Sequence, residues 1–179
     1  MGRTAQAGFT LIEILVSIAI LGIVFALGVP AYTLWIQNTQ TRTASDAVLN
    51  GLQTARNEAI RRNVAVQFRL TDAANTQWAV NLSSNPDLDP PLFGRSAQEG
   101  SANVTMIRTP ADADTVTFSA LGRVVPNADA SPTLTQVDLE NLKILVVADR
   151  RDLRILIPAG GAIRLCDPKV AVGDPRTCN

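Results

Sequence analysis

The residue that most often carries enzyme chemistry is missing from this sequence, which contains no histidine. Histidine is the commonest general base and the commonest metal ligand in proteins, so catalytic triads that depend on it are excluded. The 16 basic and 16 acidic residues balance, and no net charge steers the protein toward nucleic acid or lipid headgroups. Chemistry by a pair of carboxylates stays open as an alternative, but no spacing in the sequence suggests it. We expect no enzyme, no catalytic residue, no metal site and no cofactor.

The two cysteines, Cys166 and Cys178, both lie near the C-terminus. Two cysteines without histidine make a poor zinc site. In a chain with an export-type N-terminus, an even number of cysteines indicates a disulfide, and two free buried thiols are the alternative. A disulfide across so short a loop stabilises a fold by roughly 3 kcal/mol in chain-entropy models.

Glu13 is the one acid in a long apolar run, residues 9–29. At about 1.5 Å per residue, such a helix spans roughly 30 Å, the thickness of a bilayer's hydrocarbon core. A carboxylate in lipid costs roughly 2.5–3.5 kcal/mol, or less near the interface, and it usually has a partner. The run is longer than the apolar part of an ordinary cleaved signal peptide, and a plain signal anchor needs no acid. An incidental, tolerated acid is the alternative to a functional one.

The residues next to Glu13 form a short motif that resembles a signal of one specific protein family. Residues 8–13, with the sequence GFTLIE, resemble the class III signal of type IV prepilins and pseudopilins. The resemblance implies that residues 1–8 are a leader, that prepilin peptidase cuts between Gly8 and Phe9, and that the new amine of Phe9 is methylated. It also implies that Glu13 pairs with the free N-terminus of a neighbouring subunit in a filament. Such a pair sets the axial register of subunits, although its net stabilisation can be small.

A single long helix is expected to carry these residues. Apolar residues recur beyond the membrane run at intervals of three and four, at Ala44, Val48, Leu52, Ala55 and Ala59. This spacing predicts an amphipathic helix packed on a core over residues 31–62, continuous with the membrane and filament segment at 9–30. Pro30 removes a backbone hydrogen bond inside this helix. The resemblance to pilins implies local melting at Pro30 in the filament, and a simple kink is the alternative.

Residues 63–179 show the short-period alternation of strands. The predicted strands are residues 64–70, 77–82, 104–108, 115–118, 122–125, 142–148, 153–158 and 162–166. Loops are predicted at residues 83–91 and 127–132, which are rich in proline, aspartate, serine and asparagine. One long helix followed by antiparallel strands predicts an α+β, pilin-like fold, with a head formed by residues 31–179.

Two stretches of the head carry a second resemblance. Residues 55–63 (ARNEAIRRN) and 118–124 (FSALGRV) are similar to the GspH/FimT group of minor pilins and pseudopilins. This implies a minor pilin that helps to initiate type IV pilus assembly, or alternatively a minor pseudopilin of the type II secretion system. The implied partners are other pilins or pseudopilins, prepilin peptidase and an inner-membrane assembly platform. The implied location is the bacterial inner membrane, crossed once with the head in the periplasm, and then a periplasmic or surface filament.

A second alternative concerns DNA. Some FimT-like proteins bind DNA during natural transformation through a Gly-Arg-x-Arg motif, and the matching residues 161–164 read GAIR, so only Arg164 is retained. Arg154, Lys169 and Arg176 could supply further phosphate contacts, but neighbouring aspartates would cancel much of their charge. The alternative role of these cations is as solvated charges or as aliphatic stems that pack against the tail.

Overall fold

The computed structural model describes residues 9–72, 76–88, 90–96, 99, 103–146 and 148–178. The chain divides into two compact units, Met1–Ile36 and Gln37–Asn179. The predicted leader, with Gly8, lies outside the described residues.

Helix α1, Leu11–Arg62, begins at a cap that the sequence itself supplies. The Glu13 backbone N–H donates to Thr10 Oγ1 at 3.3 Å, which satisfies one of the unpaired N–H groups of the first turn. Within the first unit the apolar side chains of α1 are exposed, and the helix is long and apolar enough to cross a membrane. The helix continues through Pro30, and melting or kinking at this residue stays a prediction.

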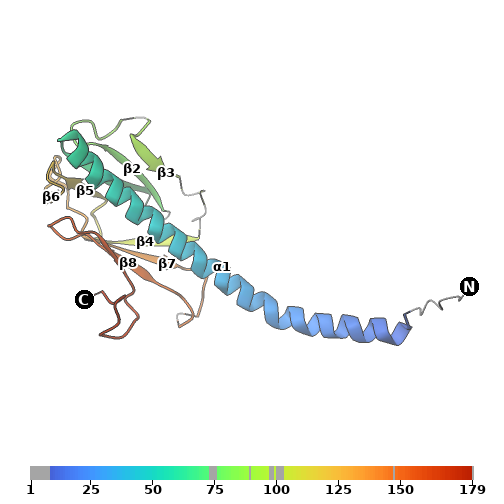
Figure 1. Cartoon of the computed structure of the whole chain (residues 1–179). Coiled ribbons are helices and arrows are strands. Elements are labelled where there is room, and N and C mark those ends of the chain that lie inside the picture. Colours follow the sequence, from blue (N-terminus) through green and yellow to red (C-terminus); the bar gives the residue numbers. More distant parts are fainter. Residues whose placement is uncertain are drawn as a thin grey trace, which may run out of the picture. The chain divides into compact units, whose positions relative to one another are not determined.

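The part of α1 that belongs to the second unit is amphipathic, as predicted. It buries one stripe of small and branched residues against the head: Ala44, Val48, Leu52, Ala55 and Ala59. Figure 1 shows this half of the helix running across the strands of the head. The helix ends where Asn63 adopts a left-handed backbone (φ 55°) and the Val64 N–H donates to the Ala59 carbonyl at 3.3 Å.

The strands of the head form two antiparallel sheets. The bounds are β1 Val66–Asp72, β2 Gln77–Leu82, β3 Phe93–Arg95, β4 Val104–Thr109, β5 Thr115–Phe118, β6 Val124–Val125, β7 Gln136–Asn141, β8 Leu153–Leu156 and β9 Arg164–Cys166. The first sheet has the order β3-β2-β1-β5-β6, and the second has the order β4-β7-β8-β9. This arrangement confirms the predicted α+β fold of a long helix packed on antiparallel sheets.

The prediction of a strand over residues 142–148 is wrong. The strand lies one segment earlier, at β7, where Val137 and Leu139 are buried and Asp138 between them is only half-buried. β7 pairs with both β4 and β8, so its alternating pattern places one apolar face on the core. The more apolar run that follows is a turn and loop with Leu142, Leu145 and Val146 exposed. The short edge strand β3 was not predicted, because three residues give no readable alternation.

A glycine sets the distance between α1 and the first sheet. A Cβ atom on Gly51 would lie 2.8 Å from carbon atoms of both the Phe68 and the Trp78 rings. Glycine inside a helix costs about 1 kcal/mol relative to alanine, so its presence here reflects close packing rather than helix propensity. The two rings pack on each other with centroids 5.6 Å apart.

We expect Gly51→Val to lower the free energy of unfolding of the head by about 1–3 kcal/mol, because the added methyl groups overpack this contact. The neighbouring Asn50→Val, at an exposed position of the same helix, is the matched control and should change stability little. The measurement is urea unfolding of the full chain in detergent, followed by circular dichroism. Equal midpoints for the two variants would show that the close approach at Gly51 has no energetic role.

Candidate functional site

The predicted assembly residues lie at the start of α1. Phe9 and Glu13 are exposed, and Glu13 occupies the first helical turn, four residues after Phe9. Helix N-termini carry a partial positive charge, so a carboxylate is favoured there. Because the whole apolar segment of this unit is exposed, it requires either lipid or the helices of other subunits to cover it.

Two aromatic residues beyond the apolar run were not singled out from the sequence. Tyr32 and Trp35 are exposed on α1, and their rings stack with centroids 6.0 Å apart. Tyrosine and tryptophan are enriched where a membrane helix leaves the hydrocarbon, because one end of each ring system is apolar and the other is polar. Their position just after the apolar run was the signal that could have revealed them.

The two head stretches that carry the family resemblance meet in space. Arg56 on α1 donates from Nε to the Gly122 carbonyl at 3.0 Å. Gly122 has φ +71° and Gly161 has φ +78°, so both turns use backbone conformations that favour glycine. A Cβ on Gly161 would lie 2.0 Å from the Gly122 carbonyl oxygen. Arg56, Gly122 and Gly161 are far apart in the sequence but in contact here, and their contacts hold the end of α1 against two turns of the head.

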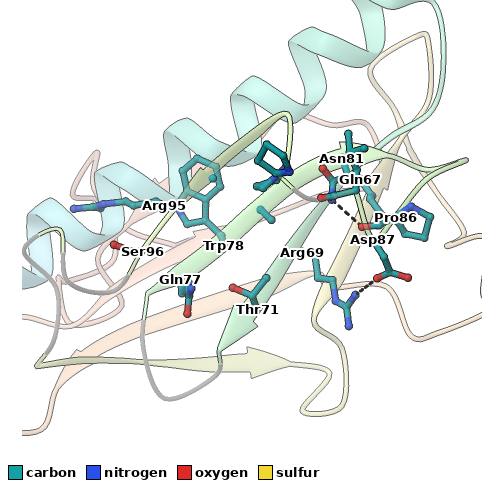
Figure 2. A pocket seen from close by; sticks show the side chains of 15 residues that line it. Gln67, Arg69, Thr71, Gln77, Trp78, Asn81, Pro86, Asp87, Arg95 and Ser96 are labelled. Atoms are coloured by element: carbon teal, nitrogen blue, oxygen red, sulfur yellow. Dashed lines mark hydrogen bonds and ion pairs between the residues drawn. The ribbon is translucent and has the colours of Figure 1, made fainter.

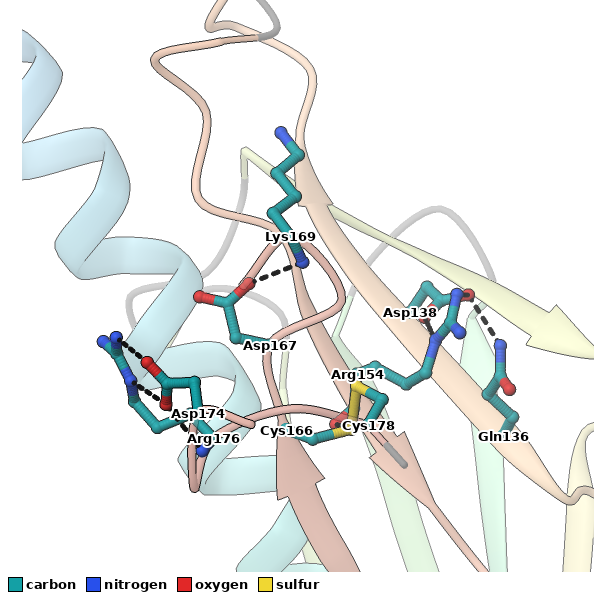
Figure 3. The surroundings of a disulfide bond; sticks show 9 residues. All are labelled: Gln136, Asp138, Arg154, Cys166, Asp167, Lys169, Asp174, Arg176 and Cys178. Carbon is teal, nitrogen blue, oxygen red and sulfur yellow. Dashed lines mark hydrogen bonds and ion pairs between the residues drawn. A yellow bond between two sulfur atoms is a disulfide. The ribbon is translucent and has the colours of Figure 1, made fainter. Parts of the chain in front are cut away.

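The C-terminal tail is fastened by the predicted disulfide. Cys166 and Cys178 are bonded, with Cα atoms 5.1 Å apart and 12 positions of sequence separation, so the alternative of two free thiols is wrong. Figure 3 shows the bond beside β9 and next to Arg154 of β8, in agreement with the pairing of Arg154 with Cys166. The Asp167 N–H donates to the Arg176 carbonyl at 2.8 Å and closes the same loop.

Replacing Cys166 and Cys178 by serine should lower the free energy of unfolding by about 3 kcal/mol, because the unfolded chain regains the freedom that the bond removes. Urea unfolding of the full chain measures this loss. Reductant should destabilise the native chain and leave the double variant unchanged. Val172→Ser, at an exposed position inside the loop, is the control. Equal stability of the native chain with and without reductant would contradict the prediction.

The cations proposed as DNA contacts lie beside carboxylates. Arg154 contacts Asp138 at 2.6 Å, Lys169 contacts Asp152 at 2.9 Å, and Arg176 contacts Asp174 at 2.8 Å. A hydrogen bond from Arg176 lowers the pKa of Asp174 to about 2, so this carboxylate is charged throughout the physiological pH range. Figure 3 shows the Arg154–Asp138 and Arg176–Asp174 pairs on opposite sides of the disulfide.

These pairs weaken the argument for DNA. A phosphate would have to compete with a carboxylate already in place for each of the three cations. Arg164, the residue that matches the motif, lies exposed on β9. The arrangement therefore gives the DNA hypothesis no observation in its favour.

A groove of about 580 Å³ lies over β1 and β2, below the loop that follows β2. Figure 2 shows Gln67, Arg69, Thr71 and Gln77 along these strands, with Arg69 reaching Asp87 at 3.2 Å. A second hollow of about 630 Å³ continues past Arg69 to Asp114, which lies 3.8 Å from it, and to Asp129. Hydrogen bonds from Ser131 lower the pKa of Asp129, which makes it a poor general acid. In these hollows Arg69 forms ion pairs with Asp87 and Asp114, and Asp129 accepts a hydrogen bond from the Ser131 N–H.

Comparisons with known proteins give matches to both the N-terminal apolar segment and the head. A family model described as type II transport protein GspH matches residues 44–161, and a model of the prokaryotic N-terminal methylation motif matches residues 3–29. A fimbrial protein of Pseudomonas aeruginosa is 35% identical over 86 residues, 48% of this chain and 54% of that protein. Fimbrial protein Q of Moraxella bovis is 33% identical over 103 residues, 52% of this chain and 65% of that protein. The chain thus spans between half and two thirds of the length of these relatives.

Among solved structures, the fold is similar to that of the type IV minor pilin FimU of Pseudomonas aeruginosa. The crystal structure aligns with a TM-score of 0.56 at 18% identity, covering 81% of this chain and 99% of FimU. At this identity the likeness shows a shared pilin fold. With the family model covering most of the head and the methylation motif on its membrane segment, the chain belongs to the GspH family of minor pilins and pseudopilins, which are structural subunits.

Proposed function

We propose that the chain is stored in the bacterial inner membrane with its head in the periplasm, and is then cleaved between Gly8 and Phe9. The new Phe9 amine is methylated, and the apolar half of α1 moves from lipid into the core of a filament. The observation that carries this proposal is a single acid, Glu13, which closes a prepilin-type signal and lies in the apolar, exposed first part of α1.

Cleavage gives Glu13 its partner. It converts the Phe9 amide nitrogen into an ammonium group, which is poorly solvated in an apolar core. A carboxylate from an adjacent subunit neutralises this charge, and leaving either group unpaired is costly. The pair therefore acts mainly as a register device that places one subunit at a defined height against the next.

Pro30 has a separate role in this proposal. The residue lies at the end of the apolar run and lacks a backbone donor, so the turn before it is held by fewer hydrogen bonds. We infer that α1 melts locally at Pro30 when it packs in the filament, which lets the membrane segment and the head adjust separately. Hydrogen exchange that is faster at the turn before Pro30 in filaments than in detergent would support this.

Among the two kinds of filament, we favour the type IV pilus, with this chain as a minor pilin that helps to start assembly on the inner-membrane platform. The relatives described above are fimbrial proteins, and FimU is a type IV minor pilin. The alternative is a minor pseudopilin of type II secretion, which the family description also allows. Deleting the gene should reduce surface pili while secretion of exoproteins continues; the opposite result would identify the secretion system.

Mass spectrometry of the native protein tests processing directly. The expected N-terminal peptide begins at Phe9 and carries one added methyl group. An intact leader, or an unmodified Phe9 amine in assembled filaments, would contradict the proposal.

A further inference from the structure

The loop between β7 and β8 covers residues 142–152, and in its described first part, residues 142–146, it places apolar side chains in solvent. Leu145 is 90% exposed, Val146 is 57% exposed and Leu142 is 55% exposed. Ile144, in contrast, is buried and holds the loop against the head. Neighbouring exposed apolar side chains of this kind mark a surface that contacts something else.

Hydrogen bonds join both ends of this loop to the first residues of the second unit. Asn141 donates from Nδ2 to the Gln37 carbonyl at 3.2 Å. Asn38 donates from Nδ2 to the Asp149 carbonyl at 3.0 Å, and its Oδ1 accepts from the Arg151 N–H at 2.9 Å. The loop that carries the exposed side chains is therefore held beside the start of the second unit, at Gln37 and Asn38.

That point lies a short distance along the chain from the membrane segment. Gln37 lies eight positions after Val29 on the helix, a rise of about 12 Å at 1.5 Å per residue. The polar headgroup layer on one side of a bilayer is itself about 5–8 Å thick. Tyr32 and Trp35 occupy this interval, as expected of an interfacial aromatic pair. The hydrogen bonds that hold the two ends of the loop are made to Gln37 and Asn38, the residues that directly follow this interval.

We propose that residues 142–146 form a lipid-contact loop in the membrane-stored subunit. Leu142, Leu145 and Val146 insert at the boundary between headgroups and acyl chains, and Lys143 between them faces the lipid phosphates. The contact holds the head at the membrane surface, and extraction into a filament breaks it. This inference rests on the membrane-stored stage of the proposed function.

Site-specific fluorescence tests the contact in the full chain. A Leu145→Cys variant is labelled with an environment-sensitive fluorophore while the native cysteines remain bonded to each other. The labelled chain is reconstituted in vesicles of phosphatidylethanolamine and phosphatidylglycerol that contain lipids with a spin label at a shallow acyl position. The matched control is Leu121→Cys, which is 80% exposed and lies beside Gly122 at the other end of the helical part of the head.

Lipid contact predicts a blue-shifted emission at position 145 and quenching at least several-fold stronger than at position 121. Equal quenching at both positions would overturn the inference. So would protection of position 145 that appears only when the ratio of protein to lipid is raised, because a second copy of the chain would then be the occupant. Vesicles that float without the protein would instead refute the membrane-stored stage, and the proposed function with it.

Discussion

Changing Glu13 to glutamine is expected to reduce incorporation of the subunit into filaments by more than about a hundredfold. Glutamine keeps the shape and removes the charge, so the ammonium of the neighbouring Phe9 is left buried without a partner. Breaking a buried ion pair costs roughly 3–5 kcal/mol, and about 1.4 kcal/mol corresponds to a factor of ten. The measurement is the fraction of the chain recovered in sheared filaments, relative to the amount in the membrane.

Ser17 provides the control for this change. It lies one turn after Glu13, and its hydroxyl donates to the Glu13 carbonyl at 2.7 Å, so Ser17→Ala removes a polar group from the same segment without touching the charge. We expect Ser17→Ala to assemble normally. Membrane levels of Glu13→Gln should not fall, because removing a charge favours insertion. Normal assembly of Glu13→Gln would refute the pairing and leave the acid as an incidental residue.

The second large effect is expected at Gly161. A Cβ there would meet the Gly122 carbonyl oxygen at 2.0 Å, and the backbone has φ +78°. The left-handed conformation costs a non-glycine residue about 1–2 kcal/mol, and displacing packed backbone adds about 1–3 kcal/mol. Gly161→Ala should therefore lower the free energy of unfolding of the head by about 2–5 kcal/mol and disturb the hydrogen bond from Arg56 to Gly122.

Gly160 is the matched control, since an alanine Cβ at this adjacent position meets nothing within 4 Å. Urea unfolding of the full chain in detergent should show a large shift of midpoint for Gly161→Ala and little shift for Gly160→Ala. If both substitutions shift the midpoint equally, the contact between Gly161 and Gly122 does not stabilise the head.

Features that depend on residues close together in the chain could be predicted from the sequence. The membrane-length run, the helical stripe from Ala44 to Ala59 and most strands follow from composition and periodicity. The disulfide was predictable because only one pairing exists for two cysteines. The signal at residues 8–13 is a short linear motif, so its resemblance to prepilin signals can be seen without a tertiary structure.

Features that depend on residues far apart in the sequence required the tertiary structure. Residues 142–148 are more apolar than Gln136–Asn141, yet the latter form the strand, because their alternating residues pair in register with both β4 and β8. Likewise, sequence composition shows that Arg154 and Asp138 exist, but only the register of β7 with β8 brings them to 2.6 Å. Periodicity reports how a residue relates to its neighbours along the chain. Long-range strand pairing and packing determine which apolar residues are buried. Because β7 pairs with β4 and β8, the apolar residues 142–146 that follow it form a loop in which Leu142, Leu145 and Val146 are exposed.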